Sequence, residues 1–219
     1  MDRRLIWFFA LLIPVTVWSW IAPHDRLTWW LEAGPVVAAA VLIIRTRNRF
    51  PLSTLLLALA WIHCAVLLVG AHYTYARVPA FEWLRELTDG TRNNYDKVGH
   101  FVQGFVPAIL AREIFLRTSP LRDRGDGRPS GWLGFVVVSV CLAFSAFYEL
   151  IEWAVAEVSG EGAESFLGTQ GYVWDTQSDM ALALVGAVCA LFALSRIHDR
   201  SLAKVLARRT IVKQVTPSP

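Results

Sequence analysis

The 219-residue sequence has few cysteines, few charges and none of the short motifs that mark the common soluble enzymes. Its three cysteines lack CxxC spacing and lie inside apolar runs, which is typical of small core residues and not of a redox pair or disulfide framework. The chain contains no nucleophile elbow, phosphate loop or dinucleotide fingerprint, so the enzyme classes built on those motifs have no support. It also shows no internal repeat.

Charged residues make up only 18% of the chain, whereas hydrophobic residues make up 55%, more than a soluble fold of this length can bury. The net charge of +3 does not indicate nucleic acid, because Lys and Arg form short clusters between apolar runs and no basic face. We therefore expect the lipid bilayer as a partner and no nucleic acid. The ten tryptophans lie mostly near the ends of apolar runs, as is typical of the membrane interface.

Six apolar stretches approach the roughly 20 residues that a helix needs to cross the hydrocarbon core. The sequence thus predicts an all-α fold, a polytopic membrane helix bundle with about six transmembrane helices. Residues 1–195 would form this single domain, and residues 196–219 a basic cytoplasmic tail. The first stretch resembles a secretory signal but lacks a small-x-small cleavage site after Trp20, so we expect it to remain as a span. The stretches are Leu5–Ile21, Trp29–Ile44, Leu52–Tyr75, Val98–Leu116, Trp132–Ala156 and Tyr172–Leu194.

The distribution of Lys and Arg predicts that both termini are cytoplasmic, because short cytoplasmic loops are enriched in these residues. Between the third and fourth stretches, Phe81, Leu84 and Leu87 repeat at helical spacing and predict a short interfacial helix. The basic tail is expected either to lie on the anionic inner leaflet or to act only as a topology determinant. The inner segments hold Arg3, Arg4, Arg45, Arg47, Arg49, Arg117, Arg122, Arg124, Arg128 and the basic residues from Arg196 to Lys213, and the outer loops hold Arg26, Arg77, Arg85 and Arg92.

Ionisable side chains within spans cost roughly 2.5–3.5 kcal/mol each on insertion scales and need a physical reason, and three of the predicted spans carry a row of polar residues that includes them. They recur at intervals of three or four residues, so within each span they share one helix face. The faces comprise Asp96, His100, Gln103 and Pro107 in the fourth span, Ser145, Glu149 and Glu152 in the fifth, and Asp175, Asp179 and Gly186 in the sixth.

These carboxylates and His100 lie at one bilayer level on the non-cytoplasmic side, where His72 of the third span also falls. Carboxylates gathered at one level repel one another unless cations, protons or a metal ion compensate them. Because a mixed carboxylate and imidazole set suits Mg, Mn, Zn or iron, we hypothesise a divalent metal ion as cofactor. The candidate metal ligands are Asp96, His100, Glu149, Glu152, Asp175 and Asp179, and the candidate catalytic acids and bases are Glu149, Glu152 and His100.

Each of these residues also has a purely structural explanation. An Asp at a helix start can cap the helix, a carboxylate beside a base can form a structural ion pair, and a histidine can hydrogen-bond another helix. Downstream of the fifth span, further carboxylates make the outer mouth acidic and attractive to cations. The capping candidates are Asp96, Asp175 and Thr176-x-x-Asp179, the counter-ions for Glu149 or Glu152 are Lys97 or Arg92, and the mouth contains Glu157, Glu161 and Glu164.

Three motifs resemble the bacterial inner-membrane family typified by YjdF: YDKVGHFVQG from Tyr95, YELIEW from Tyr148 and FLGTQGYVWDTQSDM from Phe166. This resemblance covers the chain from the second span to the sixth and implies a multispan protein of the bacterial cytoplasmic membrane, but it supplies no reaction. The pattern Asp96-Lys97-x-x-His100 with Glu149 and Asp179 is more distantly similar to VanZ-like envelope proteins, which implies a role in the cell envelope.

Three functions follow from this reading. The first is an extracytoplasmic carboxylate and histidine site that binds a metal ion and acts on a lipid-linked or envelope substrate. The second is an ion- or proton-coupled transporter of small molecules, with His63 at mid-depth as part of a proton relay. The third is a membrane scaffold whose polar cluster only locks the helix register.

Overall fold

The computed structural model describes residues 2–122, 129–159 and 169–215, and these residues contain helices and no strand. Side chains are described up to residue 207 in the last helix. The elements are α1 (Arg3–Trp20), α2 (Arg26–Thr46), α3 (Thr54–Tyr73), α4 (Pro79–Leu87), α5 (Tyr95–Thr118), the 3-10 helix η1 (Pro120–Arg122), α6 (Trp132–Ser159) and α8 (Asp175–Val215).

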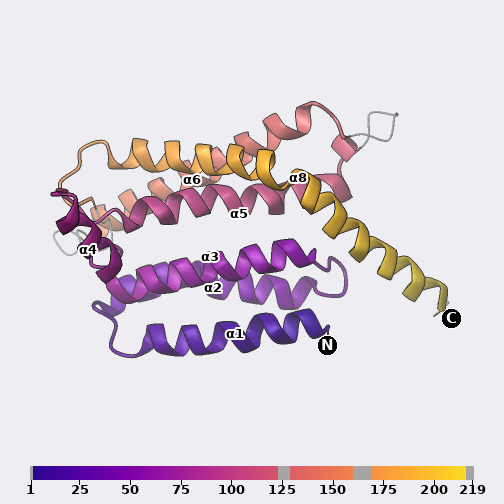
Figure 1. Cartoon of the computed structure of the whole chain (residues 1–219), viewed down its shortest axis with the longest axis horizontal. Helices are drawn as coiled ribbons and strands as arrows, with labels where there is room; N and C mark the ends of the chain where they lie inside the picture. Colours follow the sequence, from indigo (N-terminus) through magenta and orange to yellow (C-terminus); the bar gives the residue numbers. More distant parts are fainter. Residues whose placement is uncertain (1, 123–128, 160–168, 216–219) are drawn as a thin grey trace.

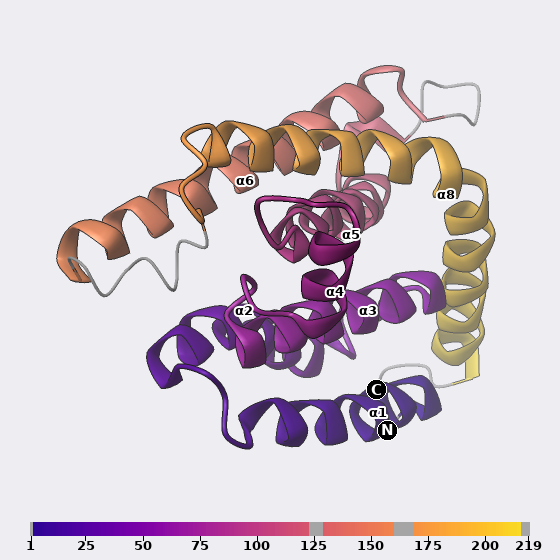
Figure 2. The ribbon, with the colours of Figure 1, turned by 60° about the vertical axis from the view of Figure 1, so that its left-hand side comes forward.

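The long helices run along one axis in two groups, α1 to α3 and α5, α6 and α8 (Figure 1). The short helix α4 lies across one end, which we call the α4 end, where α1 and α3 finish and α2 and α5 begin. The opposite end contains η1 and both ends of the chain, and we call it the η1 end. The last part of α8 turns away from the bundle axis in both views of the ribbon (Figure 2).

The exterior of the bundle is apolar, as expected of a protein surrounded by lipid. Large side chains such as Phe135, Phe144 and Phe192 are 65%, 65% and 88% exposed, which a water-soluble monomer rarely tolerates over a wide surface. Four helices of the described chain are long and apolar enough to cross a membrane: α2, α3, Trp132–Val158 of α6 and Asp175–Ala207 of α8. The helices α1, with 18 residues, and α5, with 24, run beside them.

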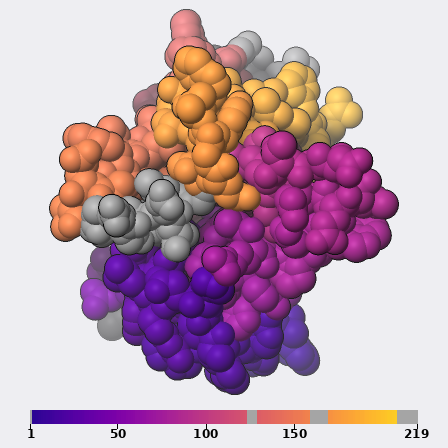
Figure 3. Space-filling model, turned by 90° about the vertical axis from the view of Figure 1, so that its left-hand side faces the viewer, coloured from indigo at the N-terminus to yellow at the C-terminus, as the bar shows by residue number. Residues whose placement is uncertain are grey.

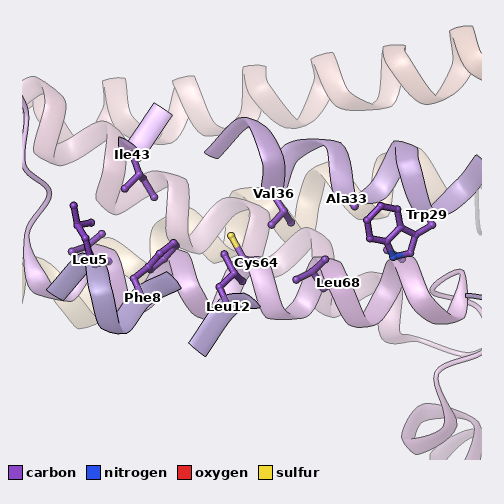
Figure 4. Close-up of a cluster of buried hydrophobic side chains, with 11 residues drawn as sticks. Leu5, Phe8, Leu12, Trp29, Ala33, Val36, Ile43, Cys64 and Leu68 are labelled. Carbon is purple, nitrogen blue, oxygen red and sulfur yellow. The ribbon is translucent and has the colours of Figure 1, made fainter. Parts of the chain in front are cut away.

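The first helical group is held by an apolar cluster to which α1, α2 and α3 all contribute (Figure 4). A short chain of hydrogen bonds also joins the three helices. Trp29 Nε1 on α2 donates to Ser19 Oγ on α1 over 2.9 Å, and that hydroxyl donates to the Leu68 carbonyl on α3 over 2.6 Å. At the start of α2, the Thr28 backbone N–H donates to Asp25 over 2.7 Å and lowers the pKa of this capping carboxylate.

In the second group, α5 is central and packs against α3, α6 and α8. Its closest approach is to α8, where two glycines let the backbones touch. A Cβ atom at Gly104 would overlap the Ala183 carbonyl, and one at Gly186 would overlap the Phe101 carbonyl. Small residues at a helix crossing allow this kind of close packing inside membranes. The two contacts fix both the spacing and the register of α5 and α8.

At the η1 end an ionic network around the fully buried Glu113 and His198 joins α3, α5 and α8. Arg112 Nη1 donates to His198 Nδ1 over 2.7 Å, so the ring proton is on Nε2, which donates to Glu113 over 3.0 Å. Glu113 also accepts from the Ser53 backbone N–H over 3.1 Å and from Arg117 over 3.0 Å. This network was not anticipated from the sequence, although Arg112 and Glu113 are charges within a predicted span.

The helix positions agree with the predicted spans to within a few residues at most boundaries, and the expected interfacial helix is α4. The main difference is α8, which does not stop near Leu194 but continues to Val215, across the predicted boundary between bundle and tail. The reason is packing: His198, Leu202 and Val205 recur at helical spacing and are buried. Residues 123–128 of the expected polar loop and Glu161 and Glu164 of the acidic mouth lie outside the described residues.

Substituting Ala for Gly104 or Gly186 should destabilise the fold, because each new methyl group would have to push α5 away from α8. Overpacking of this kind typically costs about 1–3 kcal/mol. The thermal unfolding midpoint of the purified protein measures the effect. Gly134→Ala is the matched control, since a Cβ at Gly134 would meet only the Leu191 side chain at an ordinary 3.9 Å. Equal midpoints for all three variants would contradict the proposed close contact.

Candidate functional site

Polar side chains from α5, α6 and α8 meet at the α4 end of the bundle. Asp96 is the second residue of α5 and Asp175 the first of α8, so one further helical turn places His100 and Asp179 on the same faces. The close contacts at Gly104 and Gly186, which lie further toward the η1 end, hold these two faces against each other. Seen from this end, the surface is shared by the first helices in indigo, the α4 region in magenta and the segment that enters α8 in orange (Figure 3).

Three of these residues form a compact set of potential metal ligands: Asp96, His100 and Asp179. His100 Nε2 is 3.3 Å from Asp96 Oδ1 and 3.8 Å from Asp179 Oδ2, and one ligand atom from each residue lies within 4.8 Å of the others. Ligand atoms around a tetrahedral zinc ion are roughly 3.4 Å apart, which is close to these distances. All three side chains are buried.

The orientation of the His100 ring suits a metal ligand. Its Nδ1 atom is 3.0 Å from Gln103 Oε1, an acceptor, so Nδ1 is placed to donate to that oxygen. Nε2 faces both aspartates and becomes a ligand atom when it carries no proton. Metal-binding histidines usually donate their other ring N–H to an oxygen in this way.

Glu149 lies beside this set, but the set provides no hydrogen bond to one of its carboxylate oxygens. The side chain of Glu149 is buried, and its Oε1 atom has no hydrogen-bond partner among the described residues. The same oxygen lies 3.8 Å from His100 Nδ1, beyond hydrogen-bonding distance. One turn away, the buried hydroxyl of Ser145 also has no partner in the described chain. Buried polar atoms without partners are uncommon in native proteins and indicate an ion, water or ligand.

Arg92 is the counter-ion of the site, and it pairs with different carboxylates from those predicted. Its guanidinium lies 2.5 Å from Asp175 Oδ1 and 3.5 Å from Asp96 Oδ2. Asp175 is therefore held in an ion pair beside the metal set and not within it. Lys97, the other predicted counter-ion, lies 5.5 Å from the centroid of the Tyr172 ring.

Reciprocal hydrogen bonds hold the segment that carries Arg92. The Asn93 backbone N–H donates to Gln170 Oε1, and Gln170 Nε2 donates to the Asn93 carbonyl, both over 2.9 Å. The Asn93 side chain in turn donates to the Val78 carbonyl over 3.0 Å. These bonds join the segments that precede α4, α5 and α8. They therefore hold in place the segment that carries Arg92.

A cavity of about 160 Å³ adjoins the set, with Asp96 and His100 in its wall. Most of its surface is apolar, and we call it the polar cavity because carboxylates line it. Glu152 is not part of the metal set but lines this cavity. Tyr148 of α6 and Tyr75, which follows α3, line it as well. The cavity also reveals Glu32 of α2, whose buried carboxylate accepts a 3.5 Å contact from the Tyr148 hydroxyl. Sequence reasoning missed Glu32, although a lone carboxylate inside a predicted span was a sufficient signal.

Two other histidines are not part of the metal set: His72, which was predicted at the level of the site, and His63, which was considered for a proton relay. The ring of His72 stacks on Trp18 of α1 at 4.6 Å between centroids, and its Nδ1 lies 3.1 Å from the Ser19 carbonyl oxygen. His72 therefore takes part in the contact between α1 and α3. His63 lines the polar cavity at the side that faces away from the α4 end. Of the six predicted metal ligands, the structure thus brings Asp96, His100 and Asp179 together, with Glu149 next to them.

The fold and this site define a class of protein: a multi-pass helical membrane protein with a buried carboxylate and histidine site at one end of its bundle. The chain belongs to the family described as predicted membrane protein (DUF2238), whose model matches residues 4–200. It is similar to inner membrane protein YjdF of Escherichia coli (strain K12), with 46% identity over 191 residues that cover 87% of this chain and 88% of that protein. No solved structure matches the chain significantly.

These comparisons confirm the resemblance that the three motifs indicated. The family, the relative and the four apolar helices together establish a multi-pass protein of the bacterial inner membrane. The family description assigns no activity. Any activity must therefore be inferred from the site itself. The role in the cell envelope that the similarity to VanZ-like proteins implies remains a prediction.

Replacing Arg92 with Met should destabilise the α4 end, because Asp96 and Asp175 would remain buried without their cation. Breaking a buried ion pair on one side typically costs about 3–5 kcal/mol. The double variant Arg92→Met/Asp175→Asn should recover part of the lost thermal stability. Arg85→Met is the control, because Arg85 pairs with Glu82 at the surface of α4. A loss no greater than that of the control would refute a structural role for the Arg92 pair.

Proposed function

We propose that the protein binds a divalent metal ion at the α4 end, with Asp96, His100 and Asp179 as ligands, and uses it on a lipid-linked or envelope substrate. The observation that carries this proposal is the geometry of the three buried ligand atoms, all within 4.8 Å of one another. The unpartnered oxygen of Glu149 is independent support, because it marks a place where a further group is missing.

The charge balance of the site supports the same proposal. Six carboxylates lie in or beside the cavity, whereas the cationic partner in direct contact with them is Arg92, joined by His100 only when its ring is protonated. Such an excess of buried negative charge requires protons or a bound cation. The ligand types, two carboxylates and an imidazole, suit Mn²⁺, Zn²⁺ or Fe²⁺. The carboxylates are Glu32, Asp96, Glu149, Glu152, Asp175 and Asp179.

The surrounding residues then have distinct roles. A bound divalent ion would polarise a carbonyl or phosphoryl oxygen, or activate water. Glu152, which lines the cavity, is placed to exchange a proton with a bound substrate. Glu149, which lies on the Nδ1 side of the His100 ring, serves as a second base, and Asp175 orients Asp96 through their shared contact with Arg92. His100, predicted as a catalytic group, acts in this scheme as a ligand.

We further propose that all six long helices span the membrane with both termini in the cytoplasm, so that the α4 end is extracytoplasmic. The alternation of Lys and Arg between loops supports this orientation. An 18-residue helix such as α1 is about 27 Å long, close to the hydrocarbon thickness. The charges on α5 are compatible with a span because Asp96, His100, Arg112 and Glu113 are buried in the bundle. Residues 1–195 form the membrane domain in this scheme, and the basic segment 196–219 lies on the cytoplasmic side.

We favour this site over a proton relay through His63. The groove that leads from His63 toward the η1 end is lined mainly by apolar side chains, and His63 is its only titratable imidazole. No Asp, Glu, Lys or Arg of the described chain lines it. A relay would lack the next group along its path.

The purified full-length protein should bind one Mn²⁺ or Zn²⁺ per chain, measured by elemental analysis after equilibrium dialysis. Asp179→Asn removes one ligand and should weaken binding by at least about tenfold. Glu157→Gln, an exposed carboxylate on the same helix as Glu149, is the control and should bind as the wild type does. A wild-type protein that retains no stoichiometric ion, under conditions that preserve known metalloproteins, would refute the metal site.

The same variants separate a functional site from a scaffold that only fixes helix register. If Asp179→Asn and Glu149→Gln keep the wild-type unfolding midpoint while metal binding is lost, the residues serve a ligand. If both variants fail to fold at every temperature tested, the cluster is structural. Addition of the metal should raise the midpoint of the wild type and not that of Asp179→Asn, because a ligand that binds only the folded state stabilises it.

Alkaline phosphatase fused after Gly90 should be active, and the same enzyme fused after Pro219 should be inactive. This reporter folds only outside the cytoplasm, and the proposed orientation places Gly90 outside and the C-terminus inside. A green fluorescent protein fusion at the C-terminus is the complementary control and should fluoresce. An active phosphatase at both positions would contradict the odd number of spans, α5, α6 and α8, that the proposed orientation places between them.

A further inference from the structure

A large apolar groove runs beside the polar cavity, between α2 and α5 with α3 as its floor. Its volume is about 540 Å³, within the range of pockets that hold small molecules. The lining residues come from these three helices and from the segment between α2 and α3, with no other helix of the described chain taking part. The groove is therefore open along the side between α2 and α5, which faces lipid when these helices span the membrane.

The groove and the polar cavity adjoin each other, and we call the two together the chamber. Pro35, His63, Leu67 and Pro107 line both volumes and form their common boundary. Each proline lacks an N–H group, so the carbonyls of Leu31 and Gln103 lose their usual helical donors near this boundary. The carboxylates of the chamber lie in its part toward the α4 end, and the groove contains none.

The apolar part has the length of one leaflet. From Pro35 to Thr46 on α2, and from Pro107 to Thr118 on α5, the groove follows twelve residues on each helix. The eleven steps between the first and the last residue rise about 16 Å, and half of the hydrocarbon core of a bilayer is about 15 Å. A hydrocarbon chain that enters from the membrane would find a matching apolar path.

We propose that the chamber binds an amphiphile with its hydrocarbon chain in the groove and a phosphate-bearing head group in the polar cavity. This inference rests on the proposed cation site, because the cavity alone is lined by Glu32, Asp96 and Glu152 and would repel an anion. A divalent ion held by Asp96, His100 and Asp179 would place a local positive charge at the cavity wall, to which a phosphate oxygen can coordinate directly. Phosphate is the anionic head group common to membrane lipids and lipid-linked carriers, and it coordinates such ions.

The test uses the full-length protein in phosphatidylcholine nanodiscs and two photoactivatable probes of equal chain length. One is dodecyl phosphate with a diazirine in its chain, and the other is the corresponding dodecyl glucoside, which has no charge. Labelled peptides are mapped by mass spectrometry, with Mn²⁺ or with EDTA. Dodecyl phosphate should label the groove faces of α2, α3 and α5, about tenfold more with Mn²⁺ than with EDTA. Labelling by dodecyl glucoside should not respond to the metal.

Ala39→Trp fills the groove from α2 and should reduce groove labelling about tenfold, because the chain loses its burial. Ala38→Trp is the matched control, since the neighbouring Ala38 is exposed and does not line the groove. Leu110→Trp blocks the groove independently from α5, should Ala39→Trp fail to fold. Elemental analysis of each variant confirms that the cation site is intact.

The outcomes separate this inference from the proposed function. Labelling of the groove that needs Mn²⁺ and is lost in Ala39→Trp supports the inference. Labelling that is confined to the exposed exterior, or unchanged in both groove variants, overturns it even when the protein binds metal. Groove labelling that is equal with Mn²⁺ and EDTA overturns the head-group assignment. Complete displacement of the probe by an equal concentration of inorganic phosphate identifies a site for free phosphate and also overturns it.

Discussion

The contact between the backbones of α5 and α8 is the constraint on which the rest of the structure depends. Because Gly104 and Gly186 have no side chain, the two helices meet at the Ala183 and Phe101 carbonyls with a single register. One turn from Gly104 toward the α4 end places His100 against Asp179, one turn from Ala183. Toward the η1 end, the same register brings Arg112 and His198 together. A shift by one residue would separate both pairs.

Burial of α5 explains how a helix with this many charges can lie inside a membrane protein. Each ionisable group at mid-membrane costs roughly 2.5–3.5 kcal/mol on insertion scales unless protein surrounds it. Here α3, α6 and α8 pack around α5, and the charges on α5 face these helices and one another. The apolar exterior is left to helices such as α6, which presents Phe135 and Phe144 outward. The polar ends of α5 therefore require the whole second helical group to be assembled around them.

The positions of the helices, and the helix face that carries Asp96 and His100, can be predicted from the sequence because both follow from residue spacing along one element. The rotation of one helix relative to another cannot be predicted from spacing, and the partners of each side chain depend on that rotation. For this reason Arg92 pairs with Asp175 and Asp96, not with Glu149 or Glu152 as predicted. His72 shares the depth of the site but faces α1. Depth alone cannot distinguish these cases, since residues on opposite sides of a bundle share it.

The two polar clusters of the molecule allow a comparison within one fold. At the η1 end, both carboxylate oxygens of Glu113 accept hydrogen bonds, from Ser53, Arg117 and His198, as a structural network requires. At the α4 end, Glu149 keeps a buried oxygen without a hydrogen bond in the described chain, and a cavity adjoins the carboxylates. The central residues of both clusters are buried, so an unsatisfied polar group is costly in each. A cluster that only fixed helix register would be expected to close as the first one does, and the incomplete one has room for a ligand.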